Sequence, residues 1–397
     1  MQNFAEINFL VGVNGAGKSR YLNKIAEYYN SQDCNILEIS NTVFDRFYFE
    51  SKKIKKLIIR NDKNFLVLSL LSIFDNIKEN HLDNNLYKQL RFISSSFNYA
   101  GYGSNIRVKF FIKDKRNKKI NEIDLLNLDL DDLVYEAKLK YENFKEIDFL
   151  YSGFDEVKSS IERLVQKDNS LIVDFGSDYY LNNNLRLLYR IFNYFKNLVF
   201  VDFKFFLGKQ NNLIPLEHIS SGELHLLLNT IFLASNIDFE RKNIVLIDEP
   251  EVSLHPKWQR EYVERLFGNF KYYDFQFFFA THSPLIISKL QYQESENLEK
   301  ISYKIFKVKD SEIFPVVEDN DYSIESMYWE VFEILTPQSS FLSRYTVKLV
   351  EDYERNKVSF KFVNEEFDKL IKNSITEKQN NLLKIVKNNF LELYGDH

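Results

Sequence analysis

The chain has 397 residues, a formal net charge of −5, one cysteine and 45% hydrophobic residues, enough apolar content for more than one core. The single cysteine, Cys34, excludes an internal disulfide framework and a multi-cysteine zinc site, and the negative charge excludes a general attraction to nucleic acid. The first residues lack the pattern of a signal peptide, and no apolar run approaches the roughly 20 residues of a membrane span, so we expect a cytoplasmic protein.

A glycine-rich motif lies close to the start of the chain. Residues 12–19 read GVNGAGKS and fit the pattern G-x-x-x-x-G-K-[ST] at every fixed position. The apolar run from Ile7 to Val11 predicts a buried strand before it, and the spacing of apolar residues after it predicts a helix. In that context, backbone N–H groups and the helix N-terminus bind phosphates. The residues expected at the nucleotide are Asn14, Gly15, Ala16, Gly17, Lys18, Ser19 and Arg20, with Lys18 at the β- and γ-phosphates and Ser19 on Mg²⁺.

A long stretch then separates this loop from the next motif. Residues 51–184 show no sustained heptads, and we interpret them as a compact, mostly helical insertion with one β-hairpin. The hairpin pairs residues 106–112 with residues 120–126 across a basic turn. Its basic residues, and a second basic cluster over residues 51–60, fit either contacts with DNA phosphates or ordinary solvated charges. The Ile and Leu spacing of the second cluster indicates a packed element with a charged face.

Three further motifs follow in the second half of the chain. Ser220, Ser221, Gly222 and Glu223 open an apolar helical pattern, which on its own indicates a helix N-cap with an acidic first turn. The apolar run 244–247 predicts a strand that ends in Asp248, suited to the Mg²⁺ shell, and Glu249, suited to a general base for an attacking water. The run 275–279 predicts another strand, which leads to His282.

The order of these four motifs resembles that of the ABC-type ATPases. The resemblance implies that Ser220, Ser221, Gly222 and Glu223 form a signature loop, in which Ser220 contacts the γ-phosphate of ATP held by a second copy. It implies that His282 senses the γ-phosphate and, with Lys18 and Glu249, forms the catalytic set. It further implies that residues 253–255 form a dimer-facing D-loop.

Within that superfamily, the sequences of residues 220–223, 248–256 and 280–284 are similar to those of the SMC-related and OLD-like branch. Residues 36–47 and 323–345 resemble segments of Septu-type and retron-associated ATPases of bacterial anti-phage defence, with PARIS as a more distant cousin. The resemblance implies ATP and Mg²⁺ as cofactors, a homodimer or higher homo-oligomer through the heads, and a separate nuclease or toxin as effector.

The resulting fold prediction is an α/β, ABC-type P-loop ATPase head built from two parts of the sequence. Residues 1–50 and 185–316 form the head, residues 51–184 the mostly helical insertion, and residues 317–397 a helical C-terminal region for oligomer or partner contacts. Two amphipathic helices are predicted there, over residues 342–354 and 379–394.

Several features depart from the family pattern. The strands that usually precede the P-loop strand are expected to be shortened or missing. No glutamine stands where the family has its Q-loop, and Asn41 near that place is either a substitute ligand or an ordinary turn residue. Too few residues follow Glu351 for a Toprim nuclease domain, so we expect no nuclease activity in this chain.

Three functions stay open on this basis. The first is an ATPase that senses or regulates within an anti-phage complex and controls a separate effector. The second is an ATPase stimulated by DNA, with DNA as a further partner, motivated by the basic hairpin. The third is a scaffold that binds ATP and turns it over very slowly, motivated by the missing glutamine. A transporter subunit fits the signature wording least.

Overall fold

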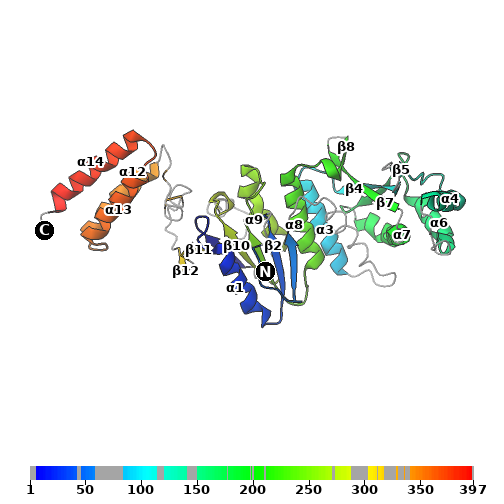
Figure 1. The fold of residues 1–397 in the computed structure, drawn as a ribbon, viewed down its shortest axis with the longest axis horizontal. Coiled ribbons are helices and arrows are strands. Elements are labelled where there is room, and N and C mark those ends of the chain that lie inside the picture. Colours follow the sequence, from blue (N-terminus) through cyan, green and yellow to red (C-terminus); the bar gives the residue numbers. More distant parts are fainter. Residues whose placement is uncertain are drawn as a thin grey trace.

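A computed structural model describes the chain over the residues 6–42, 46–58, 84–113, 120–140, 150–176, 178–196, 198, 201–209, 212–270, 273–287, 303–310, 312–316, 328–329, 335 and 340–395. Figure 1 shows these residues as an elongated molecule, with a central sheet between a second sheet on one side and C-terminal helices on the other.

The central sheet is mostly parallel. Its strands are β1 (Glu6–Val11), β2 (Cys34–Ser40), β3 (Ile54–Ile58), β9 (Lys242–Asp248), β10 (Phe275–Thr281), β11 (Tyr303–Lys309) and β12 (Glu312–Pro315). Their order is β12-β11-β1-β10-β9-β2-β3, and all neighbours run parallel except β11 and β12. The three motif-bearing strands predicted from apolar runs are β1, β9 and β10, so these predictions are confirmed.

Helices cover both faces of this sheet. Helix α1 (Lys18–Asn30) packs Leu22 and its neighbours against Leu10 of β1 and Leu246 of β9. The adjacent residues of the same strands, Phe9 before Leu10 and Ile247 after Leu246, point to the opposite face. That face is covered by α8 (Ser221–Asn236) and α9 (Pro256–Phe270). Helix α8 is buried without interruption from Gly222 to Ala234, as expected for a helix that is apolar all round.

Strand register brings the motif loops to one edge of the sheet. Val11 is paired with Thr281, and Asp248 is paired with both Ala280 and Ser40. The carboxyl ends of β1, β10, β9 and β2 therefore lie at the same level. In parallel sheets this edge is where ligands bind.

A second, antiparallel sheet lies beyond α8. It is built from β4 (Asn105–Lys113), β5 (Ile120–Glu122), β6 (Leu171–Asp174), β7 (Val201–Lys209) and β8 (Asn212–Pro215), in the order β5-β4-β7-β8 with β6 also paired to β4. Around it lie α3 (Asn84–Tyr99), α4 (Leu130–Lys140), α6 (Phe154–Leu164), α7 (Asp178–Lys196) and the short 3₁₀ helix η1 (Leu216–His218).

This sheet corrects the prediction of an insertion with a single hairpin. The β4–β5 hairpin is present, but β6 and β7 also pair with β4. These partners are distant in sequence, so no turn signal announces the pairing. Strands β7 and β8 lie in the range 185–316, which we expected to belong to the head. The expected domain boundary at residue 185 therefore falls inside this second sheet, between β6 and β7.

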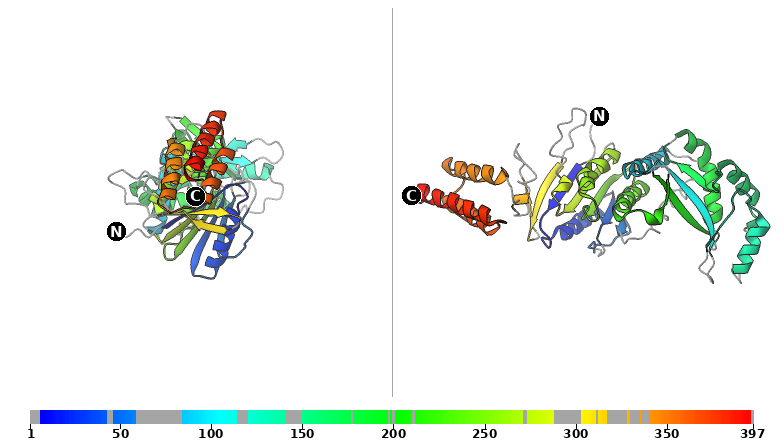
Figure 2. Two further views of the ribbon diagram at one scale, coloured as in Figure 1. Left: turned by 90° about the vertical axis from the view of Figure 1, so that its left-hand side faces the viewer. Right: turned by 90° about the horizontal axis from the view of Figure 1, so that it is seen from above.

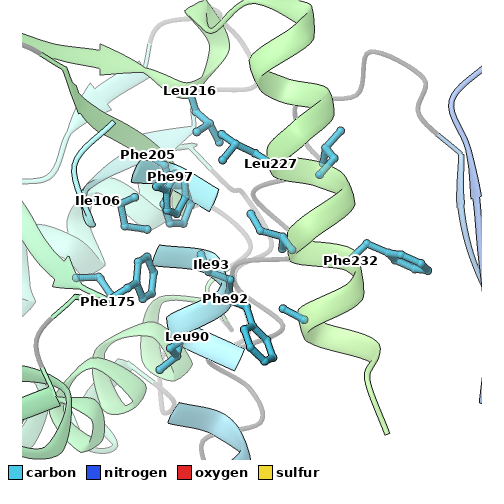
Figure 3. Packing of buried hydrophobic residues seen from close by; sticks show 14 of the residues in the cluster. Leu90, Phe92, Ile93, Phe97, Ile106, Phe175, Phe205, Leu216, Leu227 and Phe232 are labelled. Carbon is cyan, nitrogen blue, oxygen red and sulfur yellow. The ribbon is translucent and has the colours of Figure 1, made fainter. Parts of the chain in front are cut away.

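The two sheets share one hydrophobic core. Figure 3 shows Ile93 and Phe97 of α3 between α8 and the strands that carry Ile106 and Phe205. The same cluster of buried residues continues to Phe9 in the central sheet. A displacement of the second sheet would therefore change the packing of α8, because close-packed cores transmit strain.

The C-terminal region is helical, as predicted, and has a core of its own. Helices α12 (Ser340–Glu354), α13 (Phe360–Lys372) and α14 (Glu377–Tyr394) pack around a cluster that includes Trp329, Phe367 and Phe390. Figure 2 shows these helices at one end of the molecule, beyond β12. Most of residues 323–339 lie outside the described residues. None of the helices in the described part of the chain has both the length and the apolar character needed to cross a bilayer.

Candidate active site

The glycine-rich loop joins β1 to α1 and is shaped by two left-handed glycines. Gly15 has φ 83° and Gly17, the N-cap of α1, has φ 102°, values that residues with a Cβ rarely adopt. The buried Lys18 ammonium donates to the carbonyl oxygens of Gly12 at 2.8 Å and Val13 at 3.1 Å. The loop thus has the curled backbone and the central cation of a phosphate cradle. Asn14 and Arg20, also predicted at the nucleotide, are exposed at its rim.

Ser19 and Asp248, the two residues predicted to bind Mg²⁺, are in direct contact. The Ser19 hydroxyl donates to Oδ2 of Asp248 at 2.8 Å, while the other oxygen, Oδ1, is buried and has no hydrogen-bond partner among the described residues. Burial raises the pKa of Asp248 to about 6, against the bond from Ser19 and the charges of Arg46 and Lys18. A buried carboxylate oxygen without a partner beside a hydroxyl fits a hard divalent cation such as Mg²⁺, which prefers oxygen ligands.

Glu249 follows on a strained turn. Its φ of 55° is left-handed, and its N–H donates to the carbonyl of Ala280 at 2.9 Å, which fixes the turn against β10. The carboxylate is buried, and its two oxygens face different groups. Oε2 lies 2.6 Å from Nδ1 of His282, and Oε1 lies 3.5 Å from Nη1 of Arg46. The predicted base and the predicted sensor are therefore in direct contact.

A second carboxylate, Glu251, holds the His282 loop. Its Oε1 accepts the His282 N–H at 2.7 Å and lies 3.0 Å from the imidazole Nδ1, while its Oε2 accepts the Thr281 hydroxyl at 2.8 Å. Burial raises the pKa of Glu251, and the bonds it accepts from the His282 and Thr281 groups oppose that rise. The atoms of Glu249, Glu251 and His282 lie close enough to share a proton or a cation.

The signature residues begin α8, as the sequence predicts. Ser220 is the N-cap, its hydroxyl accepts the Glu223 N–H at 3.3 Å, and Glu223 Oε2 accepts the Ser220 N–H at 2.9 Å. This is a capping box. Glu223 is also bonded to Lys209 Nζ, at 2.7 Å, so the last residue of β7 is tied to the signature loop.

Gly222 has an internal packing role. A Cβ at this position would lie 2.7 Å from the Ser253 carbonyl oxygen and 3.1 Å from the Trp258 ring. Ser253, in the expected D-loop, itself has a left-handed φ of 64°. The signature loop and the D-loop therefore lie against each other on one surface, and glycine is required for that contact.

Asn41 lies beside Asp248, at the place noted for the missing glutamine. Its N–H donates to the Asp248 carbonyl at 3.2 Å, and its Oδ1 accepts from Asn229 of α8 at 3.4 Å. Its Nδ2 is buried and finds no hydrogen-bond partner within the residues that the structure describes. Asn41 therefore links the end of β9 to α8.

Comparisons with known proteins place the chain in a family. A family described as "AAA domain, putative AbiEii toxin, Type IV TA system" matches residues 41–288, more than half of the chain. The chain belongs to this AAA-domain family. The matched range covers the signature loop, Asp248, Glu249 and His282, and the glycine-rich loop lies just before it.

Three curated proteins are similar over shorter ranges. The Retron Vc95 probable ATPase of Vibrio cholerae is 38% identical over 61 residues, which cover 15% of this chain and 12% of that protein. The Retron Ec83 probable ATPase of Escherichia coli is 29% identical over 172 residues, covering 41% and 29%. The Septu protein PtuA of Bacillus mycoides is 27% identical over 196 residues, covering 46% and 26%. The matches span less than a third of each relative's length.

Two residues of this AAA-domain site were not predicted from the sequence. Glu251 follows Glu249 in the same turn, and its spacing in the run DEPE is the only signal that could have suggested it. Arg46 lies in the segment 36–47 that resembles defence ATPases, but nothing in its local pattern indicates a contact with Glu249. Both contacts arise because loops from different strands meet at one edge of the sheet.

Proposed function

We propose that this chain binds Mg²⁺ and ATP at the carboxyl edge of its central sheet and hydrolyses ATP to ADP and phosphate. The observation that carries the proposal is the Ser19–Asp248 pair beside the glycine-rich loop that holds Lys18, with one Asp248 oxygen that bonds to no group in the described part of the chain. Ser19 and Asp248 would hold the cation, and residues 14–20 would contact the phosphates.

Each remaining group has a role in this reaction. Mg²⁺, when bound, supplies charge neutralisation between the β- and γ-phosphates. Glu249 accepts the proton of the attacking water, because its carboxylate is fixed at the site by a buried turn. His282 faces both Glu249 and Glu251, and this position supports a role in orienting the base and sensing the γ-phosphate.

We propose further that two heads enclose the ATP, with Ser220 of one copy at the γ-phosphate of the other. Two contacts support this. Among the described residues of one chain, the hydrogen bonds of the Ser220 hydroxyl are to Glu223 and none is to the chain's own glycine-rich loop. The contact of Gly222 with Ser253 gives the signature loop and the D-loop a common surface, which suits a partner head.

The relatives suggest the biological setting. Because two are named as probable ATPases of retrons and one as a Septu protein, we propose that this chain is the regulatory ATPase of an anti-phage defence complex. In that complex, a separate nuclease or toxin is the effector. Co-expression with the product of a neighbouring gene tests the proposal: we expect both proteins to purify together, and repeated failure to do so would count against it.

The ATPase proposal is tested by measuring nucleotide binding and phosphate release in parallel. Wild-type protein should bind Mg-ATP and release phosphate, Lys18→Ala should lose binding, and Asp248→Asn should lose the Mg²⁺ dependence. Binding without measurable turnover would favour the scaffold function instead.

The alternative of a DNA-processing ATPase gains little support from the described basic residues. Lys53, Lys55 and Lys56 donate to carbonyl oxygens within the chain, and Arg107 and Lys109 pair with Asp168 and Glu122, respectively. The other basic residues of the hairpin turn, Lys115, Arg116, Lys118 and Lys119, lie outside the described residues. Neutralising these four should leave DNA affinity and its salt dependence unchanged, and a clear loss of both would revive this alternative.

A further inference from the structure

Arg46 lies at the mouth of the site and has no role in the scheme above. Its guanidinium Nη1 is 3.5 Å from Glu249 Oε1. The Arg46 side chain is 49% exposed, whereas that of Glu249 is 5% exposed. The guanidinium therefore lies on the solvent side of the buried carboxylate, close enough to Lys18 of the glycine-rich loop for the two charges to interact.

The backbone of Arg46 is fixed to the phosphate-binding helix. Asn23 of α1 is buried, and its Nδ2 donates to the carbonyls of Ser19 at 2.8 Å and Arg46 at 2.9 Å. Its Oδ1 accepts the N–H groups of Tyr48 at 2.9 Å and Phe49 at 3.1 Å. Both donors and both acceptor sites of this amide are thus used. One side chain holds the Arg46 loop at a set distance from Lys18 and Ser19.

The contact between Arg46 and Glu249 is unsuited to a purely structural role. At 3.5 Å with a half-exposed partner, an ion pair contributes little to stability. Arginine presents a planar fork of donors that matches phosphate oxygens in pairs, and it stays charged under all ordinary conditions. A terminal phosphate entering the site would therefore compete effectively with Glu249 for this guanidinium.

We propose that Arg46 binds the γ-phosphate of ATP held by its own chain, and that this contact releases Oε1 of Glu249 to act as the base. The inference rests on the proposed ATPase function. Without a γ-phosphate, Arg46 stays on Glu249 and His282 covers the other oxygen. With a γ-phosphate, Arg46 moves onto its oxygens, and Oε1 is free to face the attacking water.

The chemical step is hydrolysis of the bond between the γ-phosphorus and the β–γ bridging oxygen. The water oxygen forms a bond to the γ-phosphorus while the bond to the β–γ bridging oxygen breaks, and the electron pair of that bond stays on ADP. The proton lost by the water passes to Oε1 of Glu249 and then to the released phosphate. Arg46 is not consumed, and it returns to Glu249 when the phosphate leaves.

The test compares triphosphate with diphosphate binding, so that it does not depend on turnover. Dissociation constants for ADP and for adenylyl-imidodiphosphate, which cannot be hydrolysed at the β–γ bridge, are measured calorimetrically with Mg²⁺. Wild type, Arg46→Ala, Arg46→Lys and the control Arg163→Ala are compared. Arg163 is exposed in the last turn of α6, away from the site.

We expect Arg46→Ala to weaken triphosphate binding roughly ten- to hundredfold, the worth of a hydrogen bond to a charged group, and to change ADP binding less than about twofold. Arg46→Lys should be intermediate because it keeps the charge and loses the fork. Arg163→Ala should match wild type. An unchanged ratio of the two affinities in a folded Arg46→Ala protein would overturn this inference alone, whereas wild type that binds neither nucleotide would overturn the proposed function as well.

Discussion

Nδ1 of His282 lies 2.6 Å from Oε2 of Glu249, and this contact joins the ends of two neighbouring strands, β9 and β10. The imidazole also lies 3.0 Å from Glu251, so it stands between two buried carboxylates. The contact brings the proposed γ-phosphate sensor, at the end of β10, and the proposed base, at the end of β9, to one place. It also makes each of these groups open to separate tests.

Glu249→Gln should separate binding from hydrolysis. The amide keeps the size of the side chain but cannot accept the proton of the attacking water. We expect phosphate release to fall roughly a hundred- to ten-thousandfold, with ATP affinity within about threefold of wild type. Phosphate release and equilibrium binding on the same preparation check this. A variant that still hydrolyses at the wild-type rate would remove Glu249 from the role of base.

Glu251→Ala tests whether the second carboxylate positions His282. Losing it frees the Thr281 hydroxyl and the His282 N–H together, so the His282 loop should shift. We expect kcat to fall on the order of a hundredfold with little change in KM, since a small misplacement of a catalytic group costs that much. Glu251→Gln should be less affected, because its amide oxygen can still accept the His282 N–H while its amide nitrogen can donate to the Thr281 hydroxyl in the reverse direction.

The control for the Glu251 variants is Glu162→Gln. Glu162 is an exposed acidic residue on α6. This substitution should leave kcat and KM unchanged. If Glu251→Ala raised KM and left kcat unchanged, Glu251 would act in substrate binding and not in positioning.

Gly222→Ala should destabilise the contact between the signature loop and the D-loop. The new Cβ would lie 2.7 Å from the Ser253 carbonyl, so one of the two loops must move. We expect a loss of about 1–3 kcal/mol in the free energy of unfolding, as in other overpacked sites. Gly268→Ala on α9 is the matched control because no atom of the described residues lies within 4 Å of its added Cβ, and it should gain up to about 1 kcal/mol. Equal behaviour of the two variants in denaturant titrations would contradict the packing role of Gly222.

His225 should make stability depend on pH. It is 2% exposed inside α8, and burial lowers its pKa from 6.5 to about 3. The unfolded chain therefore binds a proton that the folded chain does not, between these two values. The contribution of His225 to the free energy of unfolding is therefore fully present above about pH 6.5. It decreases as the pH falls, and about 2 kcal/mol of it is lost at pH 5. His225→Leu should lose less stability than wild type between pH 7.5 and pH 5, and parallel profiles would exclude the effect.

Much of the site could be predicted from the sequence because its signals are local. The glycine-rich loop, the strand before Asp248 and the helix after Ser220 each occupy a short continuous stretch. Other contacts join residues that are far apart in the chain. They are the hydrogen bond between Glu251 and the His282 N–H, the contact of Arg46 with Glu249, and the pairing of β6 and β7 with β4. Those contacts depend on strand order and register, which local periodicity does not encode.

The head-dimer mechanism is tested most directly by the mass of the Glu249→Gln protein in solution, measured by light scattering with and without Mg-ATP. Hydrolysis is blocked in this variant, so a dimer that encloses ATP should accumulate. The mass should therefore double when Mg-ATP is added. Adding Ser220→Arg, which places a bulky side chain at the signature loop, should abolish the doubling. A mass that stays the same with and without Mg-ATP, or a doubling that survives Ser220→Arg, would contradict a site shared between two heads.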